Sequence, residues 1–104
     1  MNESDVFRAL ADPTRRAVLE RLLEGEKNAT ELREGLGISQ PAVSQHVAVL
    51  RSVGLIAEKK HGRHVHYSLA PDGLAPVFDW LSRYRAYWPA RVERLKTLLK
   101  EMDQ

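Results

Sequence analysis

The sequence contains no cysteine. This absence excludes disulfide bonds, thiolate metal ligands, thiol redox sensing and cysteine nucleophiles. The sequence also lacks an apolar run of about 18 residues, the length that a membrane-spanning helix needs. Residues 2–5 are polar, and two of them are acidic, so the sequence starts without the basic residues and apolar stretch of a secretory signal. We therefore expect a cytoplasmic protein with no membrane partner.

The excess of positive over negative charge is also small, because 16 Lys and Arg residues against 14 acidic residues leave a net charge of only +2. So small an excess does not identify a partner, and the position of the charges must decide. The 104 residues suffice for one domain. A domain this small buries only about two-thirds of its unfolded surface, so we expect two chains to associate.

Four short helices are expected before residue 55. Asp12 followed by proline opens the second, and Asn28 with Glu31 forms a capping box at the start of the third. The apolar positions that define the helices are Val6, Phe7 and Leu10 in the first, Val18, Leu19, Leu22 and Leu23 in the second, Leu32 and Leu36 in the third, and Val43, Val47 and Leu50 in the fourth.

The third and fourth helices are predicted to meet at a sharp angle. Only residues 36–39 separate the two apolar patterns, and this short connection contains Gly37. Ser39 is the predicted cap of the fourth helix, which Gly54 ends. The residues expected on its outward side are Gln40, Pro41, Ser44, Gln45 and Ala48.

After Leu55 the apolar period changes to two, which indicates β-structure. Residues 55–60 are one expected strand, His61-Gly62-Arg63 is the tight connection, and residues 64–69 are the second strand. In the second strand, one face is expected to carry Val65, Tyr67 and Leu69 and the other His64, His66 and Ser68.

A last helix is predicted from Pro71-Asp72 onward. Pro89 falls inside its apolar stripe and deletes one backbone hydrogen bond, but the stripe continues across it. The pattern therefore favours a single kinked helix over two separate ones. Its three- and four-residue spacings are typical of a seam between two chains, formed by Val77, Leu81, Tyr84, Trp88, Val92, Leu95, Leu99 and Met102.

This order of elements predicts a winged helix-turn-helix, mainly α with a small β-hairpin wing. One domain spans 1–104, with a DNA-binding core at 3–70 and a dimerisation helix at 71–104. The fourth helix suits a major groove about 12 Å wide, and an amide such as that of Gln40 or Gln45 can pair bidentately with adenine. Ser44 can serve bases or phosphates. The alternative is that these polar residues merely keep a surface helix hydrated.

The charge near this helix favours the DNA interpretation. Glu58 is the only acidic residue from Arg51 to Ala70, whereas Lys59, Lys60 and Arg63 are basic. Phosphate contact is the natural use of such a stretch. We therefore expect DNA contacts from the fourth helix at Ser39, Gln40, Pro41, Ser44, Gln45 and Arg51, and from the wing at Lys59, Lys60, His61, Arg63 and His64.

Three separated motifs, in order and with matching gaps, closely resemble the ArsR/SmtB family of bacterial repressors. They are residues 7–16 (FRALADPTRR), residues 36–47 (LGISQPAVSQHV) and residues 62–69 (GRHVHYSL). The segment at residues 78–89 resembles a cysteine-free, autorepressor-like branch. The resemblance implies a homodimer, formed by the first and last helices and including Val6 and Leu10, that binds an inverted-repeat operator and represses transcription.

Relatives in that family often release DNA when metal binds, through cysteines on the third helix or Asp and His pairs on the last. Here the third helix has no thiol, and the last has Asp79 but no histidine. Neither usual site can form, so no metal or cofactor is predicted and the effector stays unknown. A zinc site from the wing histidines His61, His64 and His66 is an alternative. His46 is expected to be half-buried and structural.

Two other classes of function compete with DNA binding. An enzyme is not expected, because Ser44 and His46 point about 160° apart around one helix and cannot act as nucleophile and base. A winged helix that binds only another protein is the second alternative. Its interaction surface would be the aromatic residues of the last helix, since such residues are enriched at interface hot spots: Trp80, Tyr84, Tyr87 and Trp88.

Overall fold

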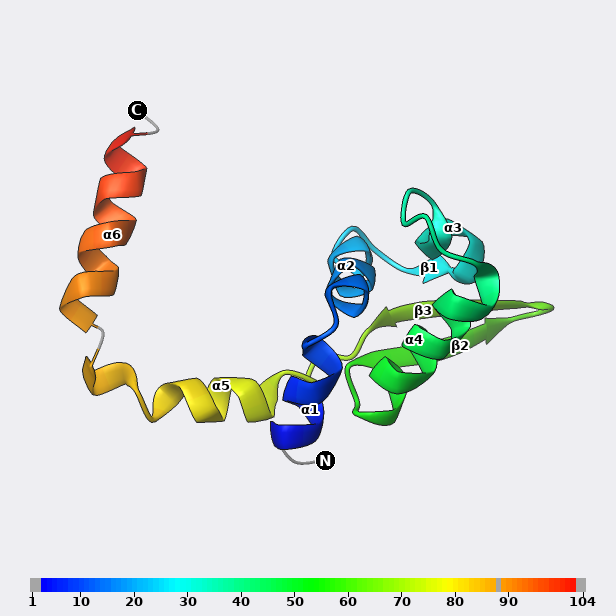
Figure 1. Cartoon of the computed structure of the whole chain (residues 1–104), viewed down its shortest axis with the longest axis horizontal. Helices are drawn as coiled ribbons and strands as arrows, with labels where there is room; N and C mark the ends of the chain where they lie inside the picture. Colours follow the sequence, from blue (N-terminus) through cyan, green and yellow to red (C-terminus); the bar gives the residue numbers. More distant parts are fainter. Residues whose placement is uncertain (1–2, 88, 103–104) are drawn as a thin grey trace.

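The computed structural model describes residues 3–87 and 89–102, which form a compact body and a C-terminal arm, residues 89–102 (Figure 1). The predicted winged helix-turn-helix order is confirmed. The elements in chain order are α1 Glu3–Leu10, α2 Pro13–Leu22, β1 Lys27–Asn28, α3 Ala29–Arg33, α4 Gln40–Ser52, β2 Ile56–His61, β3 His64–Leu69, α5 Ala75–Ser82, a 3₁₀ turn Arg85–Tyr87 and α6 Pro89–Met102.

The helices begin where the capping residues predict. The Asp12 carboxylate accepts hydrogen bonds from the first two free backbone N–H groups of α2, at 2.7 and 3.1 Å. Asn28 and Glu31 form the full capping box of α3, with each side chain accepting from the other's backbone N–H at 2.9 and 3.0 Å. Ser39 Oγ accepts from the backbone of α4 at 3.2 Å. Each cap satisfies donors that a helix start leaves unpaired.

The sheet is antiparallel and has three strands in the order β1-β3-β2, one more than the sequence predicts. The unpredicted strand pairs Lys27 with Tyr67. A strand of two residues shows no alternation, so its pairing is invisible in the sequence. Gly62 begins the two-residue turn between β2 and β3 with a φ of +64°, which suits the first position of a tight hairpin turn.

One core joins the helices to the base of the sheet. Val6 belongs to it, with 0% of its surface exposed, so the prediction that Val6 faces a partner chain is wrong. Its side chain packs entirely against residues of its own chain. The core residues are Val6, Ala9, Val18, Leu22, Leu32, Val43, Val47, Leu50, Leu55 and Ile56, and Leu10 and Val77 pack against them.

The last helical segment starts later than predicted. Residues 71–74 form a turn, and Gly73 is buried in it. A Cβ atom on Gly73 would lie 2.5 Å from the backbone oxygen of Gly54, so only glycine allows this close approach. The contact anchors the start of α5 to the end of the α4 loop.

The prediction of a single kinked C-terminal helix is also wrong, because α5 ends at Ser82 and α6 begins at Pro89. Between them, the backbone N–H of Tyr87 bonds to the oxygen of Tyr84 at 3.0 Å, which tightens the chain into a 3₁₀ turn. Proline lacks an N–H and clashes with the preceding helical turn, so it suits the first position of a new helix. The predicted seam residue Trp88 lies outside the described residues.

α5 packs along α1, whereas α6 projects away from the body (Figure 1). The rings of Phe7 and Trp80 meet edge-to-face at 5.2 Å, and Trp80 stacks at a tilt on Tyr84 at 4.9 Å. The Cα radius of gyration is 16.6 Å, against about 13 Å for a compact domain of 100 residues. None of the described helices is both long and apolar enough to span a bilayer.

Candidate nucleic-acid interface

α4 has one buried and one open side, as predicted. Val43, Val47 and Leu50 are buried, whereas Ser44 and Gln45 are exposed. Pro41 is also exposed, and Gln40 is half-buried at the first position of the helix. The side chains of Gln40, Ser44 and Gln45 make no hydrogen bond or ion pair with any described residue. Their donors and acceptors are therefore free for an external partner.

The turn before α4 is held by α3. Leu32 of α3 is fully buried in the core, and Arg33 Nε donates to the backbone oxygen of Ile38 at 3.0 Å. This hydrogen bond connects α3 to the residue directly before the cap Ser39. The position of the first turn of α4 is thus set by packing on α3 and by a cap, which is the kind of rigid support that a reading element needs.

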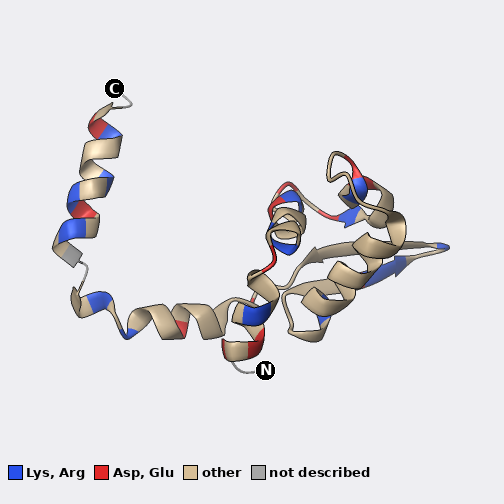
Figure 2. Ribbon diagram, in the orientation of Figure 1, with Lys and Arg blue, Asp and Glu red and all other residues tan. Residues whose placement is uncertain are grey.

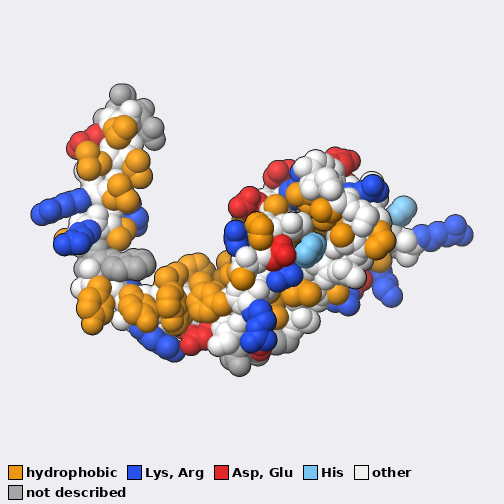
Figure 3. Space-filling model, viewed as in Figure 1, with side chains coloured by type: hydrophobic (Ala, Val, Ile, Leu, Met, Phe, Trp, Pro, Cys, Tyr) orange, Lys and Arg blue, Asp and Glu red, His pale blue; other side chains and the backbone are white. Residues whose placement is uncertain are grey.

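The wing presents basic side chains at the end of the molecule opposite the arm. Lys59, Lys60, Arg63 and His64 are all exposed, and among the described residues none of the three cations has an ion-pair partner. Figure 2 shows Lys and Arg along β2 and at the hairpin tip, and Figure 3 shows basic side chains extending beyond that tip. An unpaired cation at a protruding tip is suited to phosphate contact.

Arg51 differs from the other predicted contacts, because it is already paired within the chain. Its guanidinium forms a hydrogen-bonded ion pair with Glu58 across the gap between α4 and β2. The Arg51 side chain is 49% exposed, so its outer donors still face solvent. Its positive charge is nevertheless offset by Glu58.

His61 also has an acidic partner that the sequence did not indicate. Glu26 Oε1, in the loop after α2, lies 3.0 Å from His61 Nε2 and 3.4 Å from His66 Nδ1. The two imidazole rings meet edge-to-face at 4.9 Å. Glu26 is 35 residues away from His61 in sequence, so no local pattern reveals the contact. It ties the wing to the segment between α2 and α3.

The wing histidines are the residues of the alternative zinc site. Within residues 3–87 and 89–102, no group of three or more His, Cys, Asp or Glu side chains could hold a metal ion. The observed partner of His61 and His66 is Glu26, while His64 is exposed. The metal-responsive alternative therefore gains no support from the described geometry.

His46 is half-buried on the inner flank of α4, as predicted. The pKa of Asp12 lies below its usual value, chiefly because its carboxylate accepts the backbone N–H of Arg15, with a further contribution from the N–H of Thr14. The charges of His46 and Arg15 act in the same direction. His46 thus stands near the α1–α2 corner, away from the open side of α4.

A capped helix with an unpaired polar face, supported by a preceding helix and flanked by a basic hairpin, defines a winged helix-turn-helix DNA-binding regulator. Comparison with known proteins agrees. Residues 12–58 match the family described as "Bacterial regulatory protein, arsR family". The chain belongs to this family of transcriptional regulators, which are not enzymes.

Two relatives illustrate the range of similarity. The chain is 44% identical over 78 residues to the HTH-type transcriptional regulator Rv2034 of Mycobacterium tuberculosis, covering 75% of this chain and 73% of the relative. It is 32% identical over 81 residues to the transcriptional repressor SdpR of Bacillus subtilis, covering 78% and 90%. The crystal structure of the ArsR family transcriptional regulator RHA00566 superposes with a TM-score of 0.74 at 32% identity, covering 88% of this chain and 99% of that one.

Proposed function

We propose that this protein represses transcription as a homodimer on an inverted-repeat operator. In each protomer, the first turn of α4 enters the major groove, and the wing contacts phosphates beside it. The observation that carries the proposal is the polar face of α4, formed by Gln40, Ser44 and Gln45, whose side chains are unpaired within the part of the chain that the structure describes. Several relatives, including SdpR of Bacillus subtilis, are named repressors. With chromosomal DNA as the target, the expected site of action is the bacterial cytoplasm.

The chemistry of each side chain determines the role that we assign to it. The amides of Gln40 and Gln45 can each donate and accept in one plane, which is what reading adenine requires, whereas Arg63 and Lys60 supply charge without sequence information. Ser39 Oγ already accepts the capping hydrogen bond of α4, so we assign Ser39 the role of capping this helix. Pro41 shapes the first turn and brings no donor. Arg51 contacts phosphate only with the donors that Glu58 leaves free.

The homodimer is supported by surfaces that a single chain leaves open. α1 and α5 pack side by side, and Tyr84 at the end of their aromatic contact is 39% exposed. Leu95 and Leu99 on α6 are more than half exposed. Of the predicted interface, Leu10, Val77 and Leu81 are partly buried by their own chain and retain some open surface. Large exposed apolar residues that gather on one side mark an interaction surface.

Operator spacing tests this proposal. After footprinting on the promoter of the protein's own gene, binding is measured to the natural site and to versions with inserted base pairs between the half-sites. An insertion of about half a helical turn moves one half-site to the opposite face of the DNA, and a full-turn insertion of about 10 bp restores the face. We expect tight binding to be lost with the first insertion and partly regained with the second. Equal binding to all three, or to a single half-site, would refute a dimeric reader.

A further inference from the structure

The wing is supported unevenly along its length. β1 consists of two residues, and its pairing with β3 covers only Tyr67 and His66. Beyond this point β2 and β3 pair with each other as far as His61 opposite His64, next to the turn that carries Arg63. A two-stranded hairpin alone is marginally stable in water. The outer half of the wing therefore needs a further attachment if its tip is to keep one position.

Glu26 provides such an attachment from the opposite edge of the sheet. Its Oε1 lies 3.0 Å from His61 Nε2 on β2 and 3.4 Å from His66 Nδ1 on β3. Glu26 directly precedes β1, so its carboxylate connects the two outer strands of the β1-β3-β2 sheet across the middle strand. The contact reaches the last residue of β2, directly before the turn begins at Gly62.

The wing is held to the body on both of its faces. Strand alternation places His61 and His66 on one face and Glu58 on the other. On the second face, Glu58 pairs with Arg51 of α4. On the first face, Glu26 contacts both imidazoles at a point closer to the tip. α4 therefore fixes the base of the wing, and Glu26 fixes the part next to the turn.

The chemistry of the Glu26 contact defines its donor and its acceptor. An ionised carboxylate only accepts hydrogen bonds, so Nε2 of His61 must donate the one between them. The side chains of Glu26 and His66 are 34% and 27% exposed. Salt screens a partly buried contact less than one in open solvent. The attachment is therefore expected to persist at the ionic strengths used to measure DNA binding.

We propose that Glu26 is a positioning residue for the wing, which holds the turn through His61 so that Arg63 meets a phosphate from a fixed position. The proposal rests on the phosphate contact of the wing proposed above. A loop that is already ordered loses less conformational freedom on binding, and this raises affinity. His61, which the sequence predicts as a DNA contact, then serves as the point of attachment.

The charge of Glu26 and its positioning role predict opposite effects on DNA binding. By charge alone, a carboxylate beside the wing repels phosphate, so its removal strengthens binding. If Glu26 positions the wing, its removal weakens binding and reduces the number of phosphates that are contacted. The slope of log K against log salt reports that number. A partly misfolded variant loses affinity with the slope unchanged, because its folded molecules still make every contact.

Binding of the full chain to a fluorescein-labelled DNA duplex of random sequence, measured by anisotropy over a salt series, tests the proposal. We expect Glu26→Ala to bind several-fold more weakly at low salt, with a slope smaller by about 0.9 per lost phosphate contact. Glu26→Gln removes the same charge but keeps an oxygen that accepts from His61. We expect this variant to restore both the affinity and the slope.

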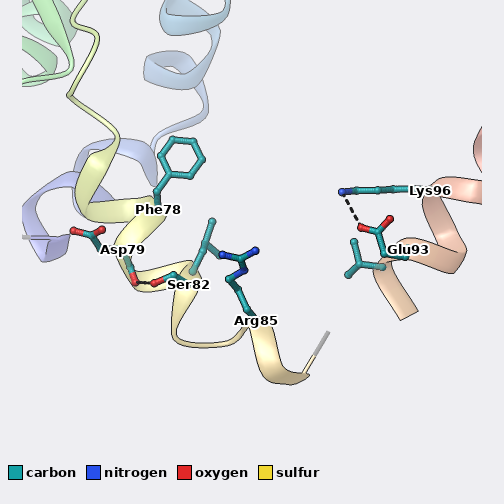
Figure 4. Close-up of a pocket in the computed structure, with 8 residues that line it drawn as sticks. Phe78, Asp79, Ser82, Arg85, Glu93 and Lys96 are labelled. Atoms are coloured by element: carbon teal, nitrogen blue, oxygen red, sulfur yellow. Dashed lines mark hydrogen bonds and ion pairs between the residues drawn. The ribbon is translucent and has the colours of Figure 1, made fainter. Parts of the chain in front are cut away.

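Two controls remove the same charge without touching the wing contact. Glu24→Ala lies two residues earlier in the same loop, and the ion-pair partner of Glu24 is Lys27, at 3.3 Å. Glu93→Ala lies on α6, where Figure 4 shows the Glu93 carboxylate paired with Lys96. We expect neither control to lose affinity or to lower the salt slope. Any gain that they share measures the effect of net charge alone.

Each outcome decides the question. Weaker binding and a smaller slope in Glu26→Ala, both restored in Glu26→Gln, support the positioning role. Binding as tight as that of Glu24→Ala, a loss with the parent slope, or a loss that Glu26→Gln does not restore overturns this role and leaves the phosphate contact of the wing intact. If Arg63→Ala keeps the slope of the parent, the phosphate contact itself is overturned, and the positioning role with it.

Discussion

The guanidinium of Arg15 reaches back from α2 to the end of α1, where its Nε donates to the backbone oxygen of Ala9 at 2.6 Å. Its Nη2 also donates to the oxygen of Arg8 at 3.2 Å, and the neighbouring Arg16 donates to the oxygen of Leu10 at 2.6 Å. The last carbonyls of a helix have no partner within that helix. Two adjacent arginines of α2 therefore complete α1 and hold the corner between the helices.

Replacement of Arg15 by alanine is expected to lower the free energy of unfolding by about 2 kcal/mol, because hydrogen bonds from a charged group typically contribute 1.5–3 kcal/mol. Urea denaturation followed by circular dichroism measures the change. Arg15→Lys is the control, since lysine keeps the charge but cannot reach two carbonyls with one planar group. A lysine variant as stable as the parent would show that charge alone matters at this corner.

The stability of the protein should fall in acid through Asp12. Its folded pKa is lowered, chiefly by the backbone N–H of Arg15. A lowered folded pKa means that the contribution is complete above the unfolded pKa of about 3.9 and is lost as the pH falls through the folded value. Asp12→Asn keeps a capping oxygen without the titration. We expect the stability gap between parent and Asp12→Asn to shrink below about pH 4, and a constant gap from pH 7 to pH 3 would contradict the assignment.

Two variants should distinguish residues that read bases from residues that contact phosphates. Gln45→Ala is expected to reduce discrimination between operator and random DNA by about 1–3 kcal/mol, because one bidentate base contact is lost. Arg63→Ala should weaken binding to both DNAs alike and reduce the slope of log K against log salt by about 0.9 per lost phosphate contact. Fluorescence anisotropy over a salt series measures both quantities. Loss of discrimination in Arg63→Ala alone would reverse the two roles.

Release of Arg51 from its acidic partner should strengthen binding to DNA. In Glu58→Gln the ion pair with Arg51 is removed, so the full charge of the guanidinium becomes available to phosphate. We expect affinity for random DNA to rise a few-fold at low salt. Glu93→Gln makes the same change in net charge on α6, away from the wing, and is the matched control. Equal gains in both variants would mean that Arg51 has no direct contact with DNA.

The sequence predicted α4 well, because the features that define this helix depend on residues close together in the chain. The cap at Ser39, the buried row of Val43, Val47 and Leu50, and the open side with Gln45 all follow from spacings within one or two helical turns. The prediction failed at Pro89, where the apolar spacing continued although the helix did not. Spacing reports which side of a helix is apolar, but the lost N–H and the steric clash of proline decide whether the helix continues.

The sequence by itself determined the order of the elements, their caps and the polar face of α4, because each depends on residues close together in the chain. Only the tertiary structure decided that Val6 is buried in the core, that Lys27 pairs with Tyr67, and that Glu26 contacts His61, 35 residues further along the sequence. Such contacts form when the folded chain brings distant segments together, and no local spacing encodes them. The tertiary structure also decided that the leucines of α6 are exposed within the described part of the chain.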